Sequence, residues 1–314
     1  MAEKEHRTTI GGQAVIEGVM MRGVKSTAMA VRKPDGDIDL EVWQNTSIRD
    51  KHKLLRIPVV RGVVSFVEML IYGYKTLMAS ADIAGFGDED EKPQDGEEKK
   101  EKKPSAGEKV MEGGSMLLGV LVAILLFSVA PMLLVKYTDP HFHYGVFKTI
   151  VEGIVRIIIF VAYLFAVSRM KDIQRVFEYH GAEHKTIHCY EHLEELTPEN
   201  AKRFSRLHPR CGTSFLLVVL VVSILVFSLA FVTWNNLLLR IIIKLVLLPV
   251  IVGISFEIIK FAGRHDNNIL LRIILAPGMW LQKLTTREPD LSQLEVAIAS
   301  LKAVLTDNRE EDKW

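Results

Sequence analysis

The sequence contains few of the residues that stabilise small secreted proteins. Only two cysteines, Cys189 and Cys211, occur among its 314 residues, which is too few for a disulfide framework and indicates reduced thiols. The first ten residues are polar and show no secretory signal. A glycine-rich segment, Thr9–Gly23, lacks the Lys-Ser/Thr ending of a phosphate-binding loop. Tight backbone packing therefore explains these glycines better than nucleotide binding does.

Charged residues are rare in four long stretches, although the chain as a whole has a formal net charge of only +1. Each stretch is long enough to cross the roughly 30 Å hydrocarbon core of a membrane as a helix. They cover residues 114–136, 146–168, 213–233 and 237–261. Only helices and closed barrels satisfy their backbone polar groups in lipid, and four such runs disfavour the alternative of a buried core in a soluble protein. The sequence therefore predicts a predominantly α-helical polytopic membrane protein with four transmembrane helices and a small cytoplasmic α+β N-terminal region.

The distribution of lysine and arginine predicts how these helices are oriented. Residues 169–212, between the second and third helices, hold eight Lys and Arg residues, whereas the other two connections are short. Cytoplasmic loops are enriched in these residues, so we expect this loop and both termini in the cytoplasm. The expected partners are the lipid bilayer and an unidentified protein or lipid-linked molecule, and no nucleic acid.

Two segments outside the predicted spans have recognisable local patterns. Residues 1–53 combine the glycine-rich segment with a predicted β-hairpin, because Thr27–Lys33 and Ile38–Trp43 flank a Pro-Asp-Gly turn. Residues 82–113 are dense in charge and lack apolar periodicity. Such a composition predicts a disordered cytoplasmic linker.

Two further segments are predicted to be helical. Residues 54–81 are apolar, but Arg61, Glu68 and Lys75 recur every seven positions and share one stripe of a helix. A charge at mid-bilayer costs about 2.5–3.5 kcal/mol, so an amphipathic or membrane-apposed helix is favoured over the alternative of a fifth span. Residues 262–314 predict an interfacial segment and then a C-terminal helix capped by Asp290.

Ionisable residues inside the predicted spans require an explanation. Glu152 and Arg156 are four residues apart in the second span, which suits an ion pair on one helix face. Glu257 lies near one end of the fourth span. Because no clear internal repeat accompanies these charges, pairs that hold helices together are favoured over a transport pathway.

The loop of residues 169–212 contains the side chains best suited to chemistry. His180, Glu183 and His184 match the H-x-x-E-H arrangement of one class of zinc hydrolases. A helix places two histidines four residues apart on one face, from which both can bind one ion. His208 and Cys211 precede the third span and can fold back against that helix. The four predicted metal ligands are therefore His180, His184, His208 and Cys211, with zinc as the first choice, and Glu183 is the predicted general base.

The same residues leave other interpretations open. Four protein ligands would form a closed structural site, whereas three ligands would leave a position for water. Glu178 and Glu191 are candidates to orient the imidazoles. A metal-free nucleophile made of Cys211 and His208, and a merely solvated polar helix face, are alternatives. Cys189 is interpreted as a small packing residue.

Five motifs, which together are specific, are distributed along nearly the whole length of the chain. They are Gly11–Arg22 (GGQAVIEGVMMR), Pro58–Gly62 (PVVRG), His180–Lys185 (HGAEHK), His208–Phe215 (HPRCGTSF) and Pro277–Thr286 (PGMWLQKLTT). In these motifs the chain resembles the YqhQ-type family of bacterial membrane proteins. The resemblance implies a multi-pass protein of the bacterial plasma membrane. It assigns no reaction, because the family is of unknown function and its occasional label of predicted metal-dependent enzyme rests on the same residues.

Two functions are compatible with this pattern. The first is a metal-dependent hydrolase at the cytoplasmic membrane face, with a peptide or a lipid-linked group as substrate. The alternative is a non-enzymatic membrane scaffold or regulator, in which a closed metal site fastens the loop to the third span. An open coordination position beside Glu183 would distinguish the enzyme from the scaffold.

Overall fold

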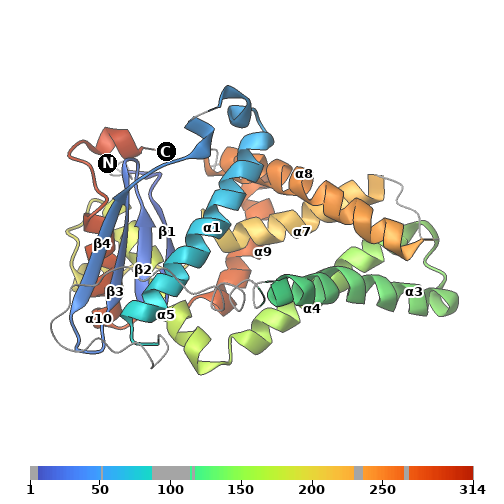
Figure 1. Cartoon of the computed structure of the whole chain (residues 1–314), viewed down its shortest axis with the longest axis horizontal. Helices are drawn as coiled ribbons and strands as arrows, with labels where there is room; N and C mark the ends of the chain where they lie inside the picture. Colours follow the sequence, from blue (N-terminus) through green and yellow to red (C-terminus); the bar gives the residue numbers. More distant parts are fainter. Residues whose placement is uncertain are drawn as a thin grey trace. The chain divides into compact units, whose positions relative to one another are not determined.

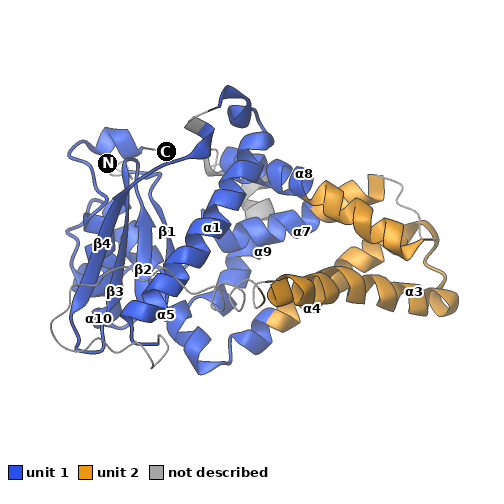
Figure 2. Ribbon diagram, in the orientation of Figure 1, with its two compact units in different colours: residues 1–87, 164–222, 249–314 blue, residues 88–163, 223–248 orange. Residues whose placement is uncertain are grey.

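The computed structural model describes residues 6–50, 52–86, 114, 117–229, 236–264 and 269–313 (Figure 1). The chain divides into two compact units (Figure 2). Unit 1 comprises residues 1–87, 164–222 and 249–314, and unit 2 comprises residues 88–163 and 223–248. Most of the predicted linker at 82–113 lies outside the described residues.

Unit 1 contains a four-stranded antiparallel sheet with strand order β1-β2-β3-β4. The strands are β1 (Gly11–Val15), β2 (Gly18–Arg22), β3 (Ser26–Arg32) and β4 (Ile38–Gln44). The predicted hairpin is β3–β4, in which Arg32 is opposite Ile38 and Gly36 has the positive φ of 95° that its turn requires. The glycine-rich segment forms a second hairpin, β1–β2, which the sequence pattern did not predict.

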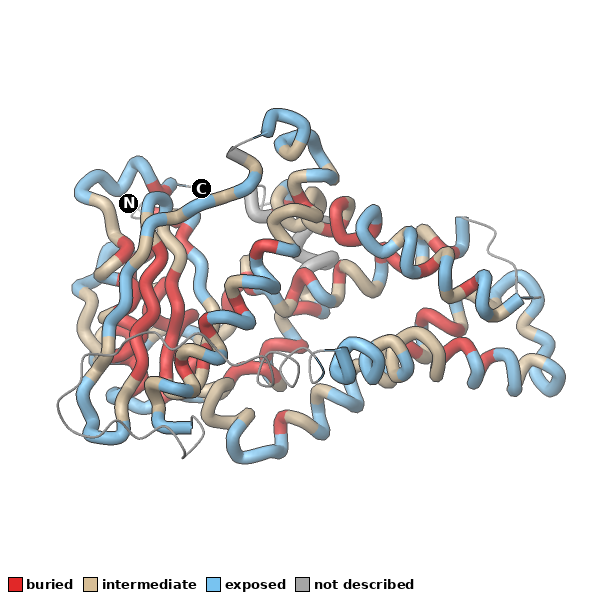
Figure 3. Tube along the Cα trace, in the orientation of Figure 1, coloured by how far each residue is buried: buried red, intermediate tan, exposed pale blue. Residues whose placement is uncertain are grey.

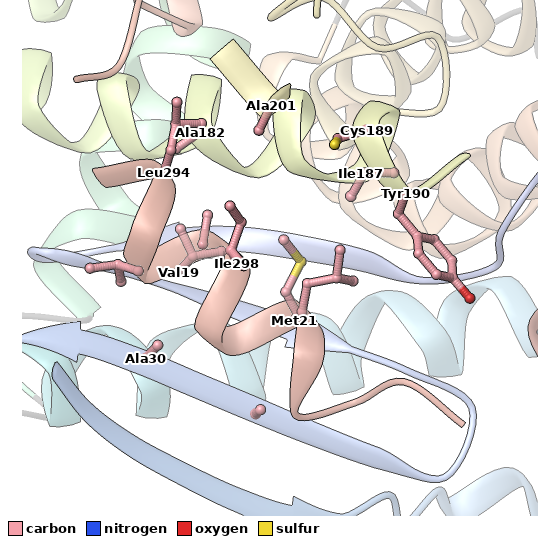
Figure 4. Packing of buried hydrophobic residues seen from close by; sticks show 14 of the residues in the cluster. Val19, Met21, Ala30, Ala182, Ile187, Cys189, Tyr190, Ala201, Leu294 and Ile298 are labelled. Carbon is pink, nitrogen blue, oxygen red and sulfur yellow. The ribbon is translucent and has the colours of Figure 1, made fainter. Parts of the chain in front are cut away.

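Helices cover both faces of this sheet because its strands alternate two sets of apolar side chains. On one face, Val19 and Met21 of β2 belong to the core cluster that includes side chains of α5 (Lys171–Glu191) and α10 (Leu291–Lys302), as Figure 4 shows. On the other face, Met20 belongs to a smaller cluster packed against the end of α1 (Val60–Ile83). Figure 3 shows how burial concentrates in the central strands of this sheet, β2 and β3. The sheet and its helices thus provide the packed support for α5.

Polar side chains cap two helices of unit 1, and the cap at Asp290 was predicted. Asp290 and Gln293 form a reciprocal capping box at the start of α10. Thr197 caps the short helix α6 (Pro198–Lys202), with a proline in its first turn. Between α8 (Leu237–Arg264) and α10 lies the helix α9 (Ile269–Thr285).

Four described helices are long and apolar enough to cross a membrane. They are Leu117–Phe142, which contains η4 (Leu125–Val129) and α3 (Ala130–Phe142); Gly145–Val167, which contains η5 (Gly145–Phe147) and α4 (Lys148–Val167); α7 (Gly212–Leu229); and Leu237–Ala262 within α8 (Leu237–Arg264). The predicted fold class is confirmed, although the first of these helices continues six residues beyond the predicted end at 136. Helix α1 is not among these four.

Helix α1 is fastened at its first turn to α8, within unit 1. Arg61 pairs with Glu257, with Nε of the arginine 2.7 Å from Oε1 of the glutamate. A Cβ added at Gly62 would lie 2.8 Å from Cβ of Phe256, so glycine permits the close approach of the two helices. Glu257 is therefore the partner of Arg61, which belongs to the segment 54–81 for which a fifth span was the alternative.

Candidate metal centre

Helix α5 presents the H-x-x-E-H residues from a straight run of helix that lies directly against the chain after α9. The helix has no proline and one glycine, Gly181. A Cβ at Gly181 would lie 2.0 Å from the carbonyl oxygen of Arg287. The Arg287 amide also donates to the carbonyl of Phe177 at 2.8 Å. Glycine is therefore required at this position for α5 to reach the segment that follows α9.

The two histidines of the motif are held in one tautomer by backbone carbonyls. Nδ1 of His180 lies 2.8 Å from the carbonyl oxygen of Thr285, and Nδ1 of His184 lies 2.6 Å from that of Arg206. A carbonyl oxygen only accepts hydrogen bonds, so each Nδ1 carries the proton and each Nε2 keeps a free lone pair. Burial lowers the pKa of His184 to about 4, which keeps it neutral near pH 7. The imidazole of His184 is thus neutral, which is the form in which histidine ligates a metal.

The third group of the centre is the thiol of Cys211, which immediately precedes α7. Its Sγ lies 3.2 Å from Nε2 of His180. Potential ligand atoms of His180, His184 and Cys211 all lie within 4.8 Å of one another. Burial alone would raise the pKa of this thiol, but the neighbouring His184 and the hydroxyl and amide of Thr213 lower it below the ordinary value. The thiolate is the form of cysteine that binds metals.

The donor set fits a zinc ion. Tetrahedral zinc has bonds of about 2.0–2.1 Å to nitrogen and about 2.3 Å to sulfur, so its ligand atoms lie about 3.5 Å apart. The 3.2 Å between His180 and Cys211 is close to this value, and the 4.8 Å limit for the set requires only small side-chain adjustments. Each imidazole donates its other N–H to a carbonyl, which is the usual support for a histidine that ligates a metal.

Glu183 lies beside these donors and is buried, with 5% of its surface exposed. Its Oε1 accepts a hydrogen bond of 3.1 Å from the amide of Gly12 in β1. A Cβ at Gly12 would lie 3.0 Å from the carboxyl carbon of Glu183, so glycine allows the strand to come this close. Burial raises the pKa of Glu183 to about 7. A carboxyl group with this pKa can both accept and donate a proton near neutral pH.

A second group of potential ligands follows on the same helix, and it includes the predicted ligand His208. His188, Glu191 and His208 also have potential ligand atoms within 4.8 Å of one another. The structure therefore brings together three of the four predicted ligands and places His208 in the neighbouring group, with its ring centre 5.6 Å from that of His184.

The second group already contains a cation and a nearly complete set of hydrogen bonds. Arg210 pairs with Glu191, and its Nη2 lies 3.4 Å from Nε2 of His208. Nδ1 of His208 accepts from the Arg210 amide at 3.3 Å, and Nε2 of His188 donates to the carbonyl of Leu207 at 3.0 Å. The guanidinium of Arg210 thus occupies the position where a metal ion would need to neutralise Glu191.

Other residues of the motifs and of the loop at 169–212 have structural roles outside the centre. Glu17 accepts two hydrogen bonds from Arg175 at 2.8 and 2.9 Å and one from the Tyr179 hydroxyl, which fastens the β1–β2 turn to α5. Glu178 accepts from Gln293 of α10 at 2.9 Å. Cys189 lies in the apolar core, where burial raises its pKa to about 11, as expected for a packing residue.

Four contributors to the site were not predicted from the sequence. The carbonyls of Arg206 and Thr285 leave no trace in the side-chain pattern, because any residue could supply them. Gly12 was noted only as part of a glycine-rich segment. Gln282 was noted only within a motif, although its amide both accepts from the amide of His208 and donates to its carbonyl, each at 2.8 Å.

Comparison with known proteins shows similarity to proteins whose function is unknown. The family described as a protein of unknown function (DUF1385) matches residues 57–307. The uncharacterized protein YqhQ of Bacillus subtilis is 36% identical over 297 residues, which are 94% of this chain and 92% of the relative. No solved structure matches the chain.

Proposed function

The chain belongs to the DUF1385 family, and from its buried donor set we propose that it is a metal-dependent hydrolase of the bacterial plasma membrane. The single observation that carries the proposal is the convergence of His180, His184 and Cys211 beside the buried carboxyl group of Glu183. The proposed ligands are the two Nε2 atoms and the thiolate sulfur, and the proposed ion is zinc. Three protein ligands leave one tetrahedral position open, as in catalytic zinc sites.

Glu183 is the proposed general base. When bound, an ion of this kind supplies Lewis-acid activation, so that water becomes a nucleophile at neutral pH. The carboxylate of Glu183 takes the proton from the attacking water and then gives it to the leaving group. The Gly12 amide holds one oxygen of this carboxylate, which fixes its orientation. The pKa of about 7 suits both halves of this proton transfer.

The place of the centre along the chain supports a substrate at the membrane. The helix α5 begins four residues after α4, and Cys211 directly precedes α7. Both of these neighbours are among the helices that are long and apolar enough to cross a membrane. We therefore propose a peptide or a lipid-linked group at the cytoplasmic membrane face as the substrate, with both termini on that side.

A structural metal site in a non-enzymatic scaffold or regulator is the second candidate. The observation that favours it is the closeness of His208, whose ring centre lies 5.6 Å from that of His184. Recruiting His208 as a fourth ligand would require its ring to leave Glu191 and the Arg210 amide. No other described group would replace His208 in its contacts with Glu191 and the Arg210 amide. The open site with three protein ligands is therefore better supported than the closed one.

Metal analysis combined with a turnover assay tests the proposal. The full-length protein is purified in mild detergent, and its bound metal is measured by mass spectrometry for the parent, His184→Ala and Glu183→Gln. Proteoliposomes are then incubated with a total bacterial membrane extract, and hydrolysis products are identified by mass spectrometry. We expect about one ion per chain in the parent, none in His184→Ala, and full metal without products in Glu183→Gln.

The possible results separate the two candidates. Products that persist in Glu183→Gln would exclude its role as general base. Stoichiometric metal without any metal-dependent products in the parent would favour the scaffold. A parent without metal after reconstitution with zinc would exclude both. Cys189→Ser serves as the matched control for Cys211→Ser, because both thiols are buried but only one belongs to the centre.

A further inference from the structure

A second buried polar cluster lies in unit 2 and is made of four charged side chains from α4 and α8. Both oxygens of Glu152 accept hydrogen bonds from cations. Nη2 of Arg156 lies 2.7 Å from Oε1, and Nη2 of Arg240 lies 2.6 Å from Oε2. Lys244 also pairs with Oε1. The pair of Glu152 and Arg156 predicted from the sequence is thus confirmed, but two further cations share its carboxylate.

The charges in this cluster do not balance. Three cations face one carboxylate, which leaves a formal charge of +2. The exposed fractions of these side chains are 8% for Arg156, 0% for Arg240, 4% for Lys244 and 1% for Glu152. The other acidic residue described in unit 2, Asp139, pairs with Lys148 at 2.6 Å. Within the described part of unit 2, no second carboxylate therefore compensates the surplus.

A surplus of buried positive charge is costly, especially in a helix that crosses a membrane. The ring of Phe227 gives partial compensation, because the Arg156 guanidinium and the Lys244 ammonium lie 5.6 and 5.7 Å from its centre. Such contacts contribute about 0.5–2 kcal/mol each, much less than an opposing charge. In addition, Nε of Arg156 is buried and has no hydrogen-bond partner among the described residues. Both observations indicate that the cluster can accommodate further negative charge.

We propose that Arg156, Arg240 and Lys244 form a binding site for a phosphate-type oxyanion. Guanidinium groups match tetrahedral and planar oxyanions with paired N–H donors, and an ammonium adds a point charge. Ser223 of α7, which accepts from Nη1 of Arg156 at 3.0 Å, has a hydroxyl that can also donate to such an oxygen. Glu152 holds the three cations in place between two helices and sets their spacing.

The position of the cluster along the helices suits a phosphate group at a membrane surface. Glu152 and Lys244 each lie seven residues after the first residue of their apolar helix, which corresponds to roughly 10 Å of helix length. Arg240 lies closer to the start of its helix. Both helices begin on the same side of the membrane if each apolar helix crosses it once. The phosphate could belong to a lipid headgroup or to a free anion, since the recognition chemistry is the same.

Anion titration of the full-length protein tests this site. The parent is purified in a zwitterionic detergent, and its thermal unfolding midpoint is measured in potassium phosphate and in potassium chloride at equal ionic strength. Retention of phosphatidylglycerol and of phosphatidylcholine is measured in parallel by native mass spectrometry. Lys244→Met removes one cation of the cluster, and Lys148→Met is the matched control because its partner is Asp139. Glu152→Gln leaves the cations without their carboxylate.

We expect phosphate or phosphatidylglycerol to stabilise the parent and Lys148→Met more than chloride or phosphatidylcholine does. Lys244→Met should bind the effective probe about tenfold more weakly, as expected when a charge-assisted hydrogen bond is lost. Glu152→Gln should bind it more tightly than the parent. A response to phosphate alone identifies a free anion, and a response to phosphatidylglycerol alone identifies a lipid headgroup.

The opposite results would identify a clamp that only holds the helices together. In that case the parent responds equally to both salts and retains both lipids equally, and Glu152→Gln is destabilised regardless of the anion. The proposal is overturned if the parent responds equally to both salts and both lipids. It is also overturned if the stability of Glu152→Gln does not depend on the anion. The parent titration distinguishes the binding site from the clamp even where Lys244→Met fails to fold.

Discussion

Helix α5 carries two groups of potential metal ligands that look alike in composition but differ in what surrounds them. Each group combines two histidines with one anionic side chain, and in each the potential ligand atoms lie within 4.8 Å of one another. In the first group both imidazoles donate to backbone carbonyls and turn a lone pair toward Cys211. In the second, Arg210 pairs with the anionic residue, Glu191.

The difference shows that the number of ligand-type residues does not by itself identify a metal site. A metal ion must bring a positive charge to a place where none is present, and it needs lone pairs that are not already used. The first group satisfies both conditions. The second has Arg210 in place of an ion, so its hydrogen bonds stabilise the structure without a metal.

The largest expected effect separates the two groups by metal content. His180→Ala removes a proposed ligand of the first group, so the zinc content of the purified protein should fall to background. His188→Ala removes the equivalent residue of the second group and should retain about one ion per chain. Metal is measured by mass spectrometry after zinc reconstitution and desalting. Equal metal content in the two variants would contradict the assignment of the ion to the first group.

Removing the cation from the second group should convert it toward a metal site. Arg210→Met leaves Glu191 and His208 buried with nothing to neutralise the carboxylate, which should destabilise the metal-free protein by about 3–5 kcal/mol. Added zinc should then restore much of the thermal midpoint and raise the metal content to about two ions per chain. If zinc changes neither the thermal midpoint nor the metal content of Arg210→Met, the guanidinium of Arg210 does not substitute for a metal ion.

Gly181 positions the helix that carries both groups of potential ligands, because it lets α5 approach the segment after α9. Gly181→Ala would set its Cβ 2.0 Å from the carbonyl oxygen of Arg287. We expect a loss of about 1–3 kcal/mol from overpacking, together with weaker zinc binding, since His180 depends on the nearby Thr285 carbonyl. Gly11→Ala is the matched control, because no atom lies within 4 Å of its added Cβ. Thermal midpoints and zinc titrations are measured for both variants. Equal losses in Gly181→Ala and Gly11→Ala would contradict the role given to Gly181.

The smallest expected effect concerns α10, which supports α5 without taking part in either group. Asp290→Ala removes the helix cap and should cost about 1 kcal/mol near neutral pH without changing the metal content. Burial alone would raise the pKa of Asp290, but hydrogen bonds from Ser292 and Gln293 lower it below the usual 3.8.

This direction of the shift predicts how the effect of Asp290→Ala depends on pH. The ionised cap stabilises the fold above the pKa of the unfolded state, and this contribution disappears as pH falls through the lower folded value. The difference in thermal midpoint between the parent and Asp290→Ala should therefore shrink in acid. A difference that stays constant down to about pH 2 would show that the carboxylate is not what stabilises the helix.

Local patterns in the sequence were sufficient to predict much of the fold. The four apolar helices, the β3–β4 hairpin and the cap at Asp290 depend on neighbouring residues and on the dihedral preferences of each segment. The β1–β2 hairpin was missed because its turn contains Glu17, whose positive φ of 50° is unusual for a residue with a side chain. Helical periodicity also placed His180 and His184 on one face, because residues four apart are neighbours on any helix.

Tertiary packing sets which distant groups complete each cluster. The sequence pattern predicted that His208 and Cys211 can fold back against α5, and the fold separates them, with Cys211 beside His180 and His208 beside Glu191. It also brought the Gly12 amide to Glu183. Likewise, it added Arg240 and Lys244 to the predicted pair of Glu152 and Arg156. Such contacts join residues far apart in the chain, and helix packing sets their geometry over distances that no local pattern encodes.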